Sequence, residues 1–398
     1  MIGRFLVGGT AVAATAAVLL LGGAFRGEAD RRTAADAESL VRSALADLQR
    51  VRETGDPAYY APAERSLRRA VALEPRNGAA LRASAALAAS RHRFAESLEL
   101  ARRAQKAEPH VAAVYGLIGD ANLELGRYRA AFAAFERQAA LKPASSAYAR
   151  IAYARELLGD TAGAISAMEL AAEAAPPGEP AAWARAQLAA LHVTARPAAA
   201  RRLYREALAI RPGYPAALEG LAGLALRDSR TDEAVALLRR AAARSADPGP
   251  AAALGDALAG AGRKAEAAGA HRRAEELERR FAEFGGRNAL ETAEFDLNHD
   301  RRVSDALVRA RRGFRERPSV EGEHVLAWAL YKNGRCEEAR HHSIRSFRLG
   351  TNDVDGLYHH SLIERCLGNR EAAGRYLERV LELDPLYLRF APSALRVG

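Results

Sequence analysis

The sequence predicts an all-α fold, an α-solenoid of about ten helix–turn–helix repeats, and three observations support this prediction. First, the chain of 398 residues is 49% hydrophobic but only 6% aromatic, and alanine, the strongest helix former, supplies most of the apolar side chains. Second, Pro75, Pro109 and Pro143 stand 34 residues apart, a period typical of helix–turn–helix repeats. Third, a small residue recurs at one fixed place in every period.

Prolines mark the end of each repeat, because proline cannot continue the hydrogen-bond ladder of the second helix. The series continues with small slips at Pro176, Pro212, Pro248, Pro318 and Pro385. When Ala112 is taken as position 1 of the clearest unit, the small residue falls at position 20, where the two helices are expected to cross. That position holds Ala63, Ser97, Ala131, Ala164, Ala200, Ala234, Ala267, Ala306, Ala339 and Ala373.

The turn between the two helices is expected at position 15 of each repeat. In the better units this position holds Gly126, Gly159, Gly262, Gly334 and Gly368. In the other units it holds His92, Ala195, Ser229 or Arg301, so we interpret those repeats as degenerate.

The unit from Ala112 to Pro143 resembles the tetratricopeptide-repeat (TPR) family. The residues that match the family pattern are Tyr115, Ile118, Gly119, Gly126, Tyr128, Ala131, Phe135 and Pro143. The resemblance covers about residues 44–386 and implies a right-handed TPR superhelix whose first helices line a concave, peptide-binding groove. The part from Arg287 onward also resembles the C-terminal region of secreted or membrane-linked repeat proteins common in actinobacteria, which implies a bacterial, extracytoplasmic location.

This register divides the chain into six segments. Residues 1–26 form a hydrophobic N-terminal segment, and residues 27–43 a linker or the start of the first helix. Repeats 1–7 occupy residues 44–284, and repeats 8–10 occupy residues 287–386. The second helix of the seventh repeat is expected from Arg263 to Phe284, so we place a joint at residues 285–286, a pair of glycines. Residues 387–398 are expected to cap the C-terminal end.

The N-terminal segment contains an uncharged stretch over residues 5–25 that is long enough to span a bilayer as a helix, which needs ~20 residues. Small residues at Gly22-Gly23-Ala24 offer a place for signal peptidase to cut. A cleaved signal peptide and an uncleaved transmembrane anchor both fit the segment. We expect an extracytoplasmic protein, either secreted or anchored to the membrane.

No catalytic motif is present. The sequence has no phosphate-binding glycine loop, no G-x-S-x-G turn and no H-E-x-x-H helix, so we expect no enzymatic activity, cofactor or small-molecule substrate. Residues 296–300 space oxygen ligands as a calcium loop does, but Arg301 replaces the turn glycine and Leu307 the bidentate acid. We interpret the pairs His341-His342 and His359-His360 as helix surface and packing, so no metal site is expected.

The groove of the last three repeats is the predicted site for a protein or peptide partner. Aromatic side chains alternate there with hydrogen-bonding groups, as in binding hot spots, whereas the groove of the middle repeats offers mostly alanine and glycine. The alternative is that Trp328 and Tyr331 pack into neighbouring repeats. The predicted partner-binding residues are Glu291, Phe295, His324, Trp328, Tyr331, Lys332, Tyr358 and Arg365.

Arginine pairs at positions 25 and 26 of several repeats are predicted to face outward on the second helices. They form either a solvated face or a basic ridge that binds an acidic surface such as anionic lipid, cell-wall polymer or nucleic acid. The ridge lacks the interleaved aromatics of a nucleic-acid reader, so no specific nucleic-acid partner is expected. Its members are Arg68, Arg69, Arg102, Arg103, Arg239, Arg240, Arg272, Arg273, Arg311 and Arg312.

The chain has two cysteines, Cys336 and Cys366, on helices that are neighbours in the predicted stack. They are interpreted either as two buried thiols that pack as small apolar side chains or as a disulfide between the last two repeats. A disulfide would require an oxidising compartment, and it needs Cα atoms no more than ~7 Å apart.

Overall fold

The computed structural model describes residues 28–390, with side chains from residue 33 to residue 389. This part of the chain is built from helices and contains no strand. The elements are α1 (Glu28–Thr54), η1 (Pro57–Tyr59), α2 (Tyr60–Leu73), α3 (Gly78–Ser90), α4 (Phe94–Ala107), α5 (Ala112–Glu124), α6 (Tyr128–Leu141), α7 (Ser145–Leu157), α8 (Thr161–Glu173), α9 (Glu179–His192), α10 (Pro197–Ile210), α11 (Pro215–Arg227), α12 (Thr231–Ala242), α13 (Pro248–Gly260), α14 (Lys264–Glu283), α15 (Ala289–Asn298), α16 (Val303–Glu316), α17 (Val320–Lys332), α18 (Cys336–Ser346), α19 (Val354–Cys366), α20 (Arg370–Leu383) and α21 (Tyr387–Phe390).

The two predicted end segments fall largely outside this range. The hydrophobic segment of residues 1–26 and the last residues of the expected cap, 391–398, lie outside the described residues. The segment expected as a linker or helix start belongs to α1, which begins at Glu28. Among the helices that the structure describes, none combines the length and the apolar character that a membrane span requires.

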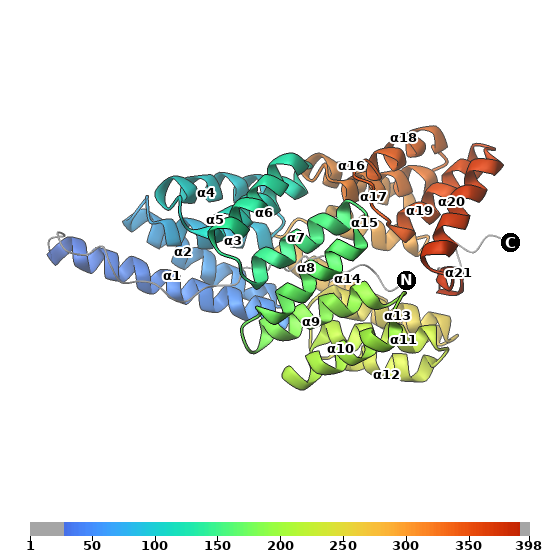
Figure 1. Cartoon of the computed structure of the whole chain (residues 1–398), viewed down its shortest axis with the longest axis horizontal. Coiled ribbons are helices and arrows are strands. Elements are labelled where there is room, and N and C mark those ends of the chain that lie inside the picture. Colours follow the sequence, from blue (N-terminus) through green and yellow to red (C-terminus); the bar gives the residue numbers. More distant parts are fainter. Residues whose placement is uncertain (1–27, 391–398) are drawn as a thin grey trace.

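The helices form two layers that wind along the coil (Figure 1). Odd-numbered helices pack against the next odd-numbered helix through most of the chain, whereas each even-numbered helix packs mainly on the helices before and after it. The odd-numbered helices are therefore the inner layer, as expected for the first helices of stacked repeats. The inner layer is weakest at two places, between α7 and α9 and between α13 and α15. The second of these places contains Gly285 and Gly286, where the joint was predicted.

All ten small residues at position 20 are buried, with exposed fractions of 8% or less. This burial is the expected consequence of two helices crossing at that position, and it extends the repeat register through the described chain. Ala63, Ala131 and Ala339, for example, are fully buried.

The second half of the chain docks on the turns of the first half, and three of these contacts have nearly the same separation in sequence. Arg93 Nε donates to the carbonyl of Gly285 at 2.9 Å, 192 residues away. The Val320 amide donates to the Tyr128 hydroxyl at 2.6 Å, also across 192 residues. The Asn352 amide donates to the carbonyl of Gly159 at 3.1 Å, across 193 residues. These contacts, together with the pairing of Arg227 with Asp384 across 157 residues, show that the coil winds back over itself, so that its second winding stacks on its first.

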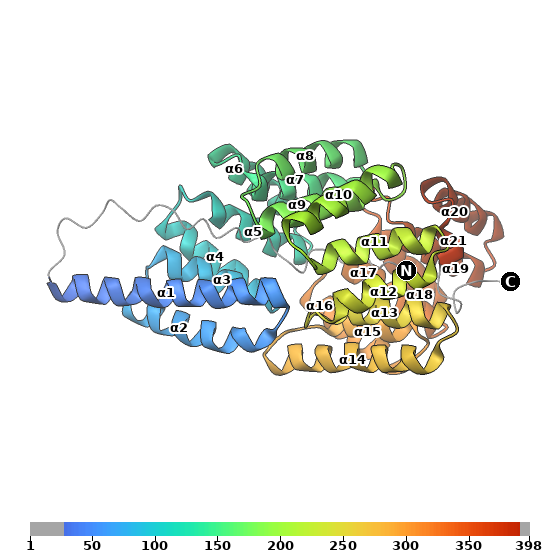
Figure 2. The same ribbon diagram turned by 90° about the horizontal axis from the view of Figure 1, so that it is seen from below.

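The long helix α14 carries the chain back to the start of the first winding. Figure 2 shows its end beside the C-terminal end of α1, and Arg280 donates to Asp56 there at 2.9 Å. Phe281 and Phe284, at the same end of α14, pack against the apolar core of the first repeats.

Glycine is required at two turns because the second winding approaches their backbone. Gly126 and Gly159 have φ of 69° and 75°, in the left-handed region. A Cβ atom at either residue would lie 2.3 Å from a carbonyl oxygen of the second winding, that of Pro318 or Gly350. A side chain at position 15 of these two repeats would therefore push the windings apart.

The degenerate turns use a side chain where the others use glycine. His92 and Ser229 adopt φ of 56° and 60° at the predicted turn position. His92 Nδ1 lies 3.0 Å from the Arg287 carbonyl oxygen, and Ser229 Oγ accepts a hydrogen bond of 2.9 Å from Arg389. Both contacts join the two windings, so the strain of a non-glycine residue accompanies a contact that glycine cannot make.

Cys336 and Cys366 form a disulfide between α18 and α19, with Cα atoms 6.2 Å apart. Cys336 is buried but Cys366 is exposed, so the prediction of two buried thiols is wrong. The bridge forms because the start of α18 and the end of α19 lie at the same end of the stack, within the usual Cα range for disulfides.

Candidate functional site

Trp328, the centre of the predicted site, lies inside the inner layer rather than on it. Its side chain is 1% exposed and stacks between Tyr331 and His359, with ring centroids 5.1 Å and 3.8 Å away. Its Nε1 donates to Asn298 Oδ1 at 3.0 Å. Of the two interpretations of Trp328, packing into neighbouring repeats describes its environment. The half-buried ring of Tyr331 stacks on it.

His324 also bonds to its own chain. Its Nε2 lies 2.8 Å from His359 Nδ1, and its Nδ1 lies 3.5 Å from Asp353. Burial opposes the charge on His324, but the hydrogen bond to Asp353 and the charges on Asp353 and the neighbouring carboxyl groups together outweigh burial and raise the pKa of His324. Burial, reinforced by the charge on His324, holds the pKa of His359 well below its usual value. His324 is therefore the donor of this pair, and neutral His359 is the acceptor.

Glu291 belongs to a buried ion cluster that joins the two windings. Arg317 is 6% exposed and forms an ion pair with Glu291. Its guanidinium also lies 3.0 Å from Glu124, at the end of α5, and 3.4 Å from Glu321. His92 Nδ1 lies 3.3 Å from Glu291. Burial would raise the pKa of Glu291, but the charge on Arg317 and then that on His92 lower it. Glu291 is thus engaged inside the protein, which sequence analysis could not foresee because Glu124 comes from a distant repeat.

Three further predicted residues, Tyr358, Lys332 and Phe295, differ in how far they reach the surface. Tyr358 is 3% exposed and packs on Tyr387, with ring centroids 5.3 Å apart. Lys332 pairs with Asp300, and its Nζ lies 5.0 Å above the Trp328 ring. Phe295 is half-buried.

Tyr331 and Arg365 form an accessible edge of the inner layer. Tyr331 is half-buried and Arg365 is exposed. Burial raises the pKa values of Tyr331 and Tyr358, and the nearby charge on Arg365 opposes this rise in both. No ion pair of Arg365 is found among the described side chains. We call Tyr331 and Arg365 the inner edge.

The candidate calcium segment does not gather its oxygen atoms around one point. Asp296 bonds to Arg302 at 2.7 Å, Asn298 accepts from Trp328, and Asp300 pairs with Lys332. The side chains turn to three different partners, so these five residues do not make the ligand cage that calcium needs.

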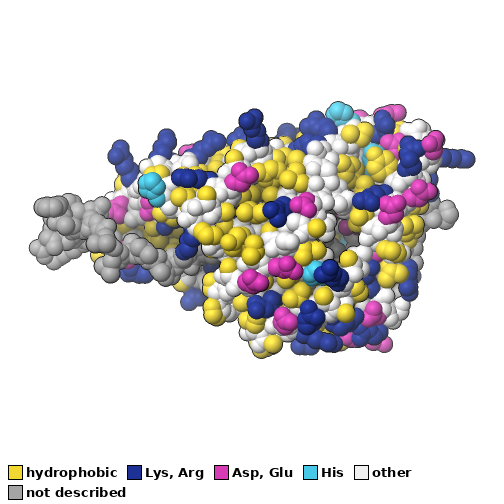
Figure 3. All heavy atoms as spheres, viewed as in Figure 1, with side chains coloured by type: hydrophobic (Ala, Val, Ile, Leu, Met, Phe, Trp, Pro, Cys, Tyr) yellow, Lys and Arg dark blue, Asp and Glu magenta, His cyan; other side chains and the backbone are white. Residues whose placement is uncertain are grey.

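The arginine pairs point outward as predicted. Nine of the ten are exposed, and Arg311 is half-buried. Several pair with neighbouring acids, at 2.5 Å for Arg68 with Glu64, 2.5 Å for Arg239 with Glu266 and 2.8 Å for Arg273 with Glu276. In Figure 3 the positive side chains gather toward the upper and lower margins of the visible face, and hydrophobic side chains cover much of its middle. These acid partners favour the solvated-face interpretation over a continuous basic ridge.

One hollow on the outer surface departs from this pattern. It has a volume of about 380 Å³, and its lining residues are Ala95, Leu98, Glu99, Arg102, Arg103, Lys106, Leu125 and Arg127. Four of these are cations and one is an acid, so the hollow is basic and includes Arg102 and Arg103 of the predicted ridge.

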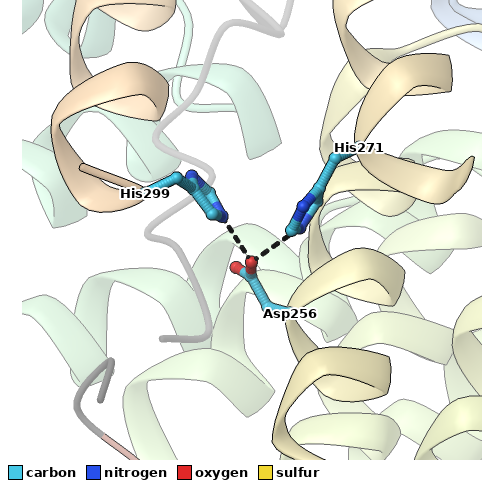
Figure 4. Close-up of side chains that lie close together, drawn as sticks. All are labelled: Asp256, His271 and His299. Atoms are coloured by element: carbon cyan, nitrogen blue, oxygen red, sulfur yellow. Dashed lines mark hydrogen bonds and ion pairs between the residues drawn. The ribbon is translucent and has the colours of Figure 1, made fainter. Parts of the chain in front are cut away.

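Three residues that the sequence did not group together meet between repeats 7 and 8, on either side of the predicted joint in sequence: Asp256 on α13, His271 on α14 and His299 at the end of α15 (Figure 4). His271 Nε2 and His299 Nε2 lie 3.0 Å and 2.7 Å from the same Asp256 oxygen. Their spacing along the chain follows no motif, so only the fold could reveal them. We call these residues the joint cluster.

Comparison with known proteins supports the repeat assignment. Tetratricopeptide-repeat family models match residues 112–145, 145–177 and 194–258. No curated protein matches the chain. Similar solved structures include the Cut9–Hcn1 hetero-tetramer of the APC/C, at 13% identity and a TM-score of 0.42, with 82% of this chain and 71% of that chain covered.

Two further solved structures are similar over most of their own length. A tetratricopeptide repeat protein from Parabacteroides merdae is 17% identical with a TM-score of 0.43, with 63% of this chain and 97% of that chain covered. The TPR domain of P58(IPK) is 16% identical with a TM-score of 0.25, with 75% of this chain and 90% of that chain covered. From the family models and the helical pairs described above, this chain is an all-α repeat solenoid that carries tetratricopeptide repeats.

Proposed function

We propose that the protein is a non-catalytic scaffold that binds a peptide or protein partner on the inner layer of its last three repeats, outside the cytoplasm. The TPR fold is consistent with protein interaction. The main support for the position is the inner edge, where Tyr331 is held by stacking on buried Trp328 and exposed Arg365 lies nearby.

The inner edge has the features of a small recognition site. An aromatic side chain that is already fixed loses little rotamer freedom when a partner packs on it. A cation beside it favours a carboxylate, since an arginine guanidinium can bind one through two hydrogen bonds. We therefore propose a partner segment that presents an acidic group beside an apolar or aromatic side chain.

Export is supported by the disulfide between Cys336 and Cys366. Disulfides persist in oxidising compartments and are rare in the cytosol. Membrane attachment through residues 1–26 remains part of this proposal.

The proposal is tested by affinity capture with the full-length chain. We expect Tyr331→Ala with Arg365→Ala to reduce the recovery of the bound partner by tenfold or more, on the order of what two hot-spot residues contribute. Arg102→Ala with Arg103→Ala serves as the matched double variant on the outer surface and is expected to leave recovery unchanged. The opposite ranking would contradict binding at the inner edge.

A second candidate function is an adaptor for an acidic surface, and the basic hollow beside α4 favours it. Binding of this kind would show in co-sedimentation with vesicles that contain anionic lipid. It should weaken steeply between low and physiological salt, because exposed charges are screened over about 8–10 Å under those conditions. Loss of such binding in the Arg102→Ala, Arg103→Ala variant would support this second function.

A further inference from the structure

The joint cluster combines two imidazoles and a carboxylate, and we propose that Asp256, His271 and His299 bind a divalent transition-metal ion of the zinc class. Their candidate ligand atoms all lie within 4.8 Å of one another. The three side chains come from three helices and are 32%, 13% and 17% exposed, so an ion could reach them from solvent. Figure 4 shows both rings directed at the carboxylate.

The hydrogen bond on the far side of His299 prepares its Nε2 as a ligand. His299 Nδ1 lies 2.6 Å from the carbonyl oxygen of Phe295. A carbonyl can only accept, so Nδ1 keeps its proton, and Nε2, which donates to Asp256 at 2.7 Å in the metal-free protein, is the atom that would release its proton and bind the ion. Histidine ligands of metals commonly donate their second ring N–H to a carbonyl or carboxylate, which fixes the tautomer and the orientation of the ring.

The neighbouring backbone leaves room for His271. A Cβ atom on Gly255 would lie 2.0 Å from His271 Cδ2. Any other residue at position 255 would displace the ring from Asp256. The ring is also packed edge-on against His299 and Phe295, with centroids 4.5 Å and 5.6 Å away.

The equivalent aspartate in another repeat shows an ordinary structural pairing. Asp120 occupies the same repeat position as Asp256, and Arg150 binds it through two hydrogen bonds of 2.8 Å and 2.6 Å. A guanidinium satisfies a carboxylate but has no lone pair for a metal. In the seventh repeat two imidazoles replace that guanidinium. The aspartate–arginine pair thus becomes a group of three side chains, one carboxylate and two imidazoles, that can each bind a metal ion.

The location gives the ion a structural role. The inner layer is weakest between α13 and α15, and the joint cluster connects both helices to α14. A bound ion would therefore tie repeat 7 to repeat 8. Imidazole and carboxylate ligands suit Zn²⁺, Co²⁺ and Ni²⁺. Three protein ligands leave at least one position for water or for a group from a partner.

The test uses the full-length chain after treatment with a chelator, titrated with Co²⁺ and, in competition with a chromophoric chelator, with Zn²⁺. We expect one equivalent of metal, a visible Co²⁺ absorption spectrum of a four- or five-coordinate site, and a higher melting temperature with Zn²⁺. His271→Ala and His299→Ala should each weaken binding by at least about tenfold, the lower bound for loss of a supporting residue. The control is His341→Ala, which removes an exposed histidine on α18.

Three results would overturn the site. They are the absence of stoichiometric Co²⁺ binding by the wild-type chain, unchanged affinity in both cluster variants, and equal weakening in His341→Ala. The Co²⁺ spectrum is measured on the wild-type chain. It therefore tests the site even if a substitution unfolds the region around the joint cluster. Circular dichroism of each variant shows whether it has folded.

Discussion

The middle repeats and the last three repeats share one fold but fill it differently. In the middle repeats the inner layer holds small residues such as Ala182 and Ala189, both fully buried. In the last three repeats the buried positions include Trp328 and the charged residues Glu323 and Glu364, which are 0% and 2% exposed. Close approach of alanine surfaces is therefore enough to stack TPR helices, and the larger and charged side chains must serve something more specific.

The charged residues specify which surfaces meet. Glu323 lies 2.6 Å from His342 and 2.7 Å from Arg345, and Glu364 lies 2.6 Å from Arg340. Buried ion pairs contribute little net stability, because desolvation offsets attraction, but a mismatched partner is strongly penalised. Alanine-lined repeats cannot make that distinction.

The largest expected loss of stability comes from replacing Trp328, and the comparison is with Trp183, the other tryptophan. Trp328→Ala should lower the free energy of unfolding by about 3–5 kcal/mol, because it leaves a large cavity and removes two ring contacts. Trp183, in the middle repeats, is only half-buried, so Trp183→Ala should cost roughly half as much. Urea denaturation of both full-length variants measures the difference, and equal losses would contradict the comparison.

A slightly smaller effect is expected at the contact between the windings. Arg317→Ala should destabilise the fold by about 3 kcal/mol, since Glu124 and Glu321 would lose their buried counter-ion and Glu291 would be left with His92 alone. The matched control is Arg375→Ala, whose partner Glu371 is exposed, and it should cost less than about 0.5 kcal/mol. Similar values for the two variants would argue against stacking of the second winding on the first through this cluster.

Reduction of the disulfide tests how much the bridge between α18 and α19 stabilises the last repeats. The bridge spans 30 residues, and closing a loop of that length stabilises the folded state by about 3 kcal/mol in the loop-entropy estimate. We expect reductant to lower the melting temperature of the wild-type chain. A Cys336→Ser, Cys366→Ser variant should be insensitive to reductant, and a melting temperature of the wild type that does not change would show that the bridge adds no stability.

The smallest effect is a pH dependence in the middle repeats. Burial, and secondarily the charge on Asp247, raises the pKa of Glu219 to about 8, above its unfolded value of 4.5. The folded state then holds this proton more tightly than the unfolded state, so stability is lost as pH rises from about 4.5 to 8. Glu219→Gln should remove that loss, so the variant should gain stability relative to the wild type between pH 5 and pH 9. A stability difference that is the same at pH 5 and pH 9 would refute this assignment.

The sequence predicted what each repeat determines by itself. Ala131 must be small because two adjacent helices cross there, and the left-handed turn at Gly126 favours glycine within its own repeat. Both constraints act within one repeat, so the period reveals them. The end of α14 just before Gly285 could be predicted from the sequence for the same reason.

Contacts between windings could not be predicted, because they depend on the pitch of the whole coil. That pitch is the sum of small rotations between repeats, and no motif encodes it. His92 was interpreted as a degenerate turn, but its ring reaches Arg287 and Glu291 in the next winding. Asp256 and His271 were not connected with His299 because that contact depends on how repeat 7 meets repeat 8, and the burial of Trp328 likewise follows from how three repeats stack.

Site-specific photo-crosslinking tests the proposed binding surface most directly. A photoreactive phenylalanine analogue is placed at residue 331 on the inner edge or at residue 102 on the outer surface. Each full-length chain is expressed in the organism that naturally produces the protein. We expect a discrete crosslinked partner from residue 331 and none from residue 102, and the adduct should disappear with Arg365→Ala. A partner that crosslinks from residue 102 and not from residue 331 would contradict binding at the inner edge.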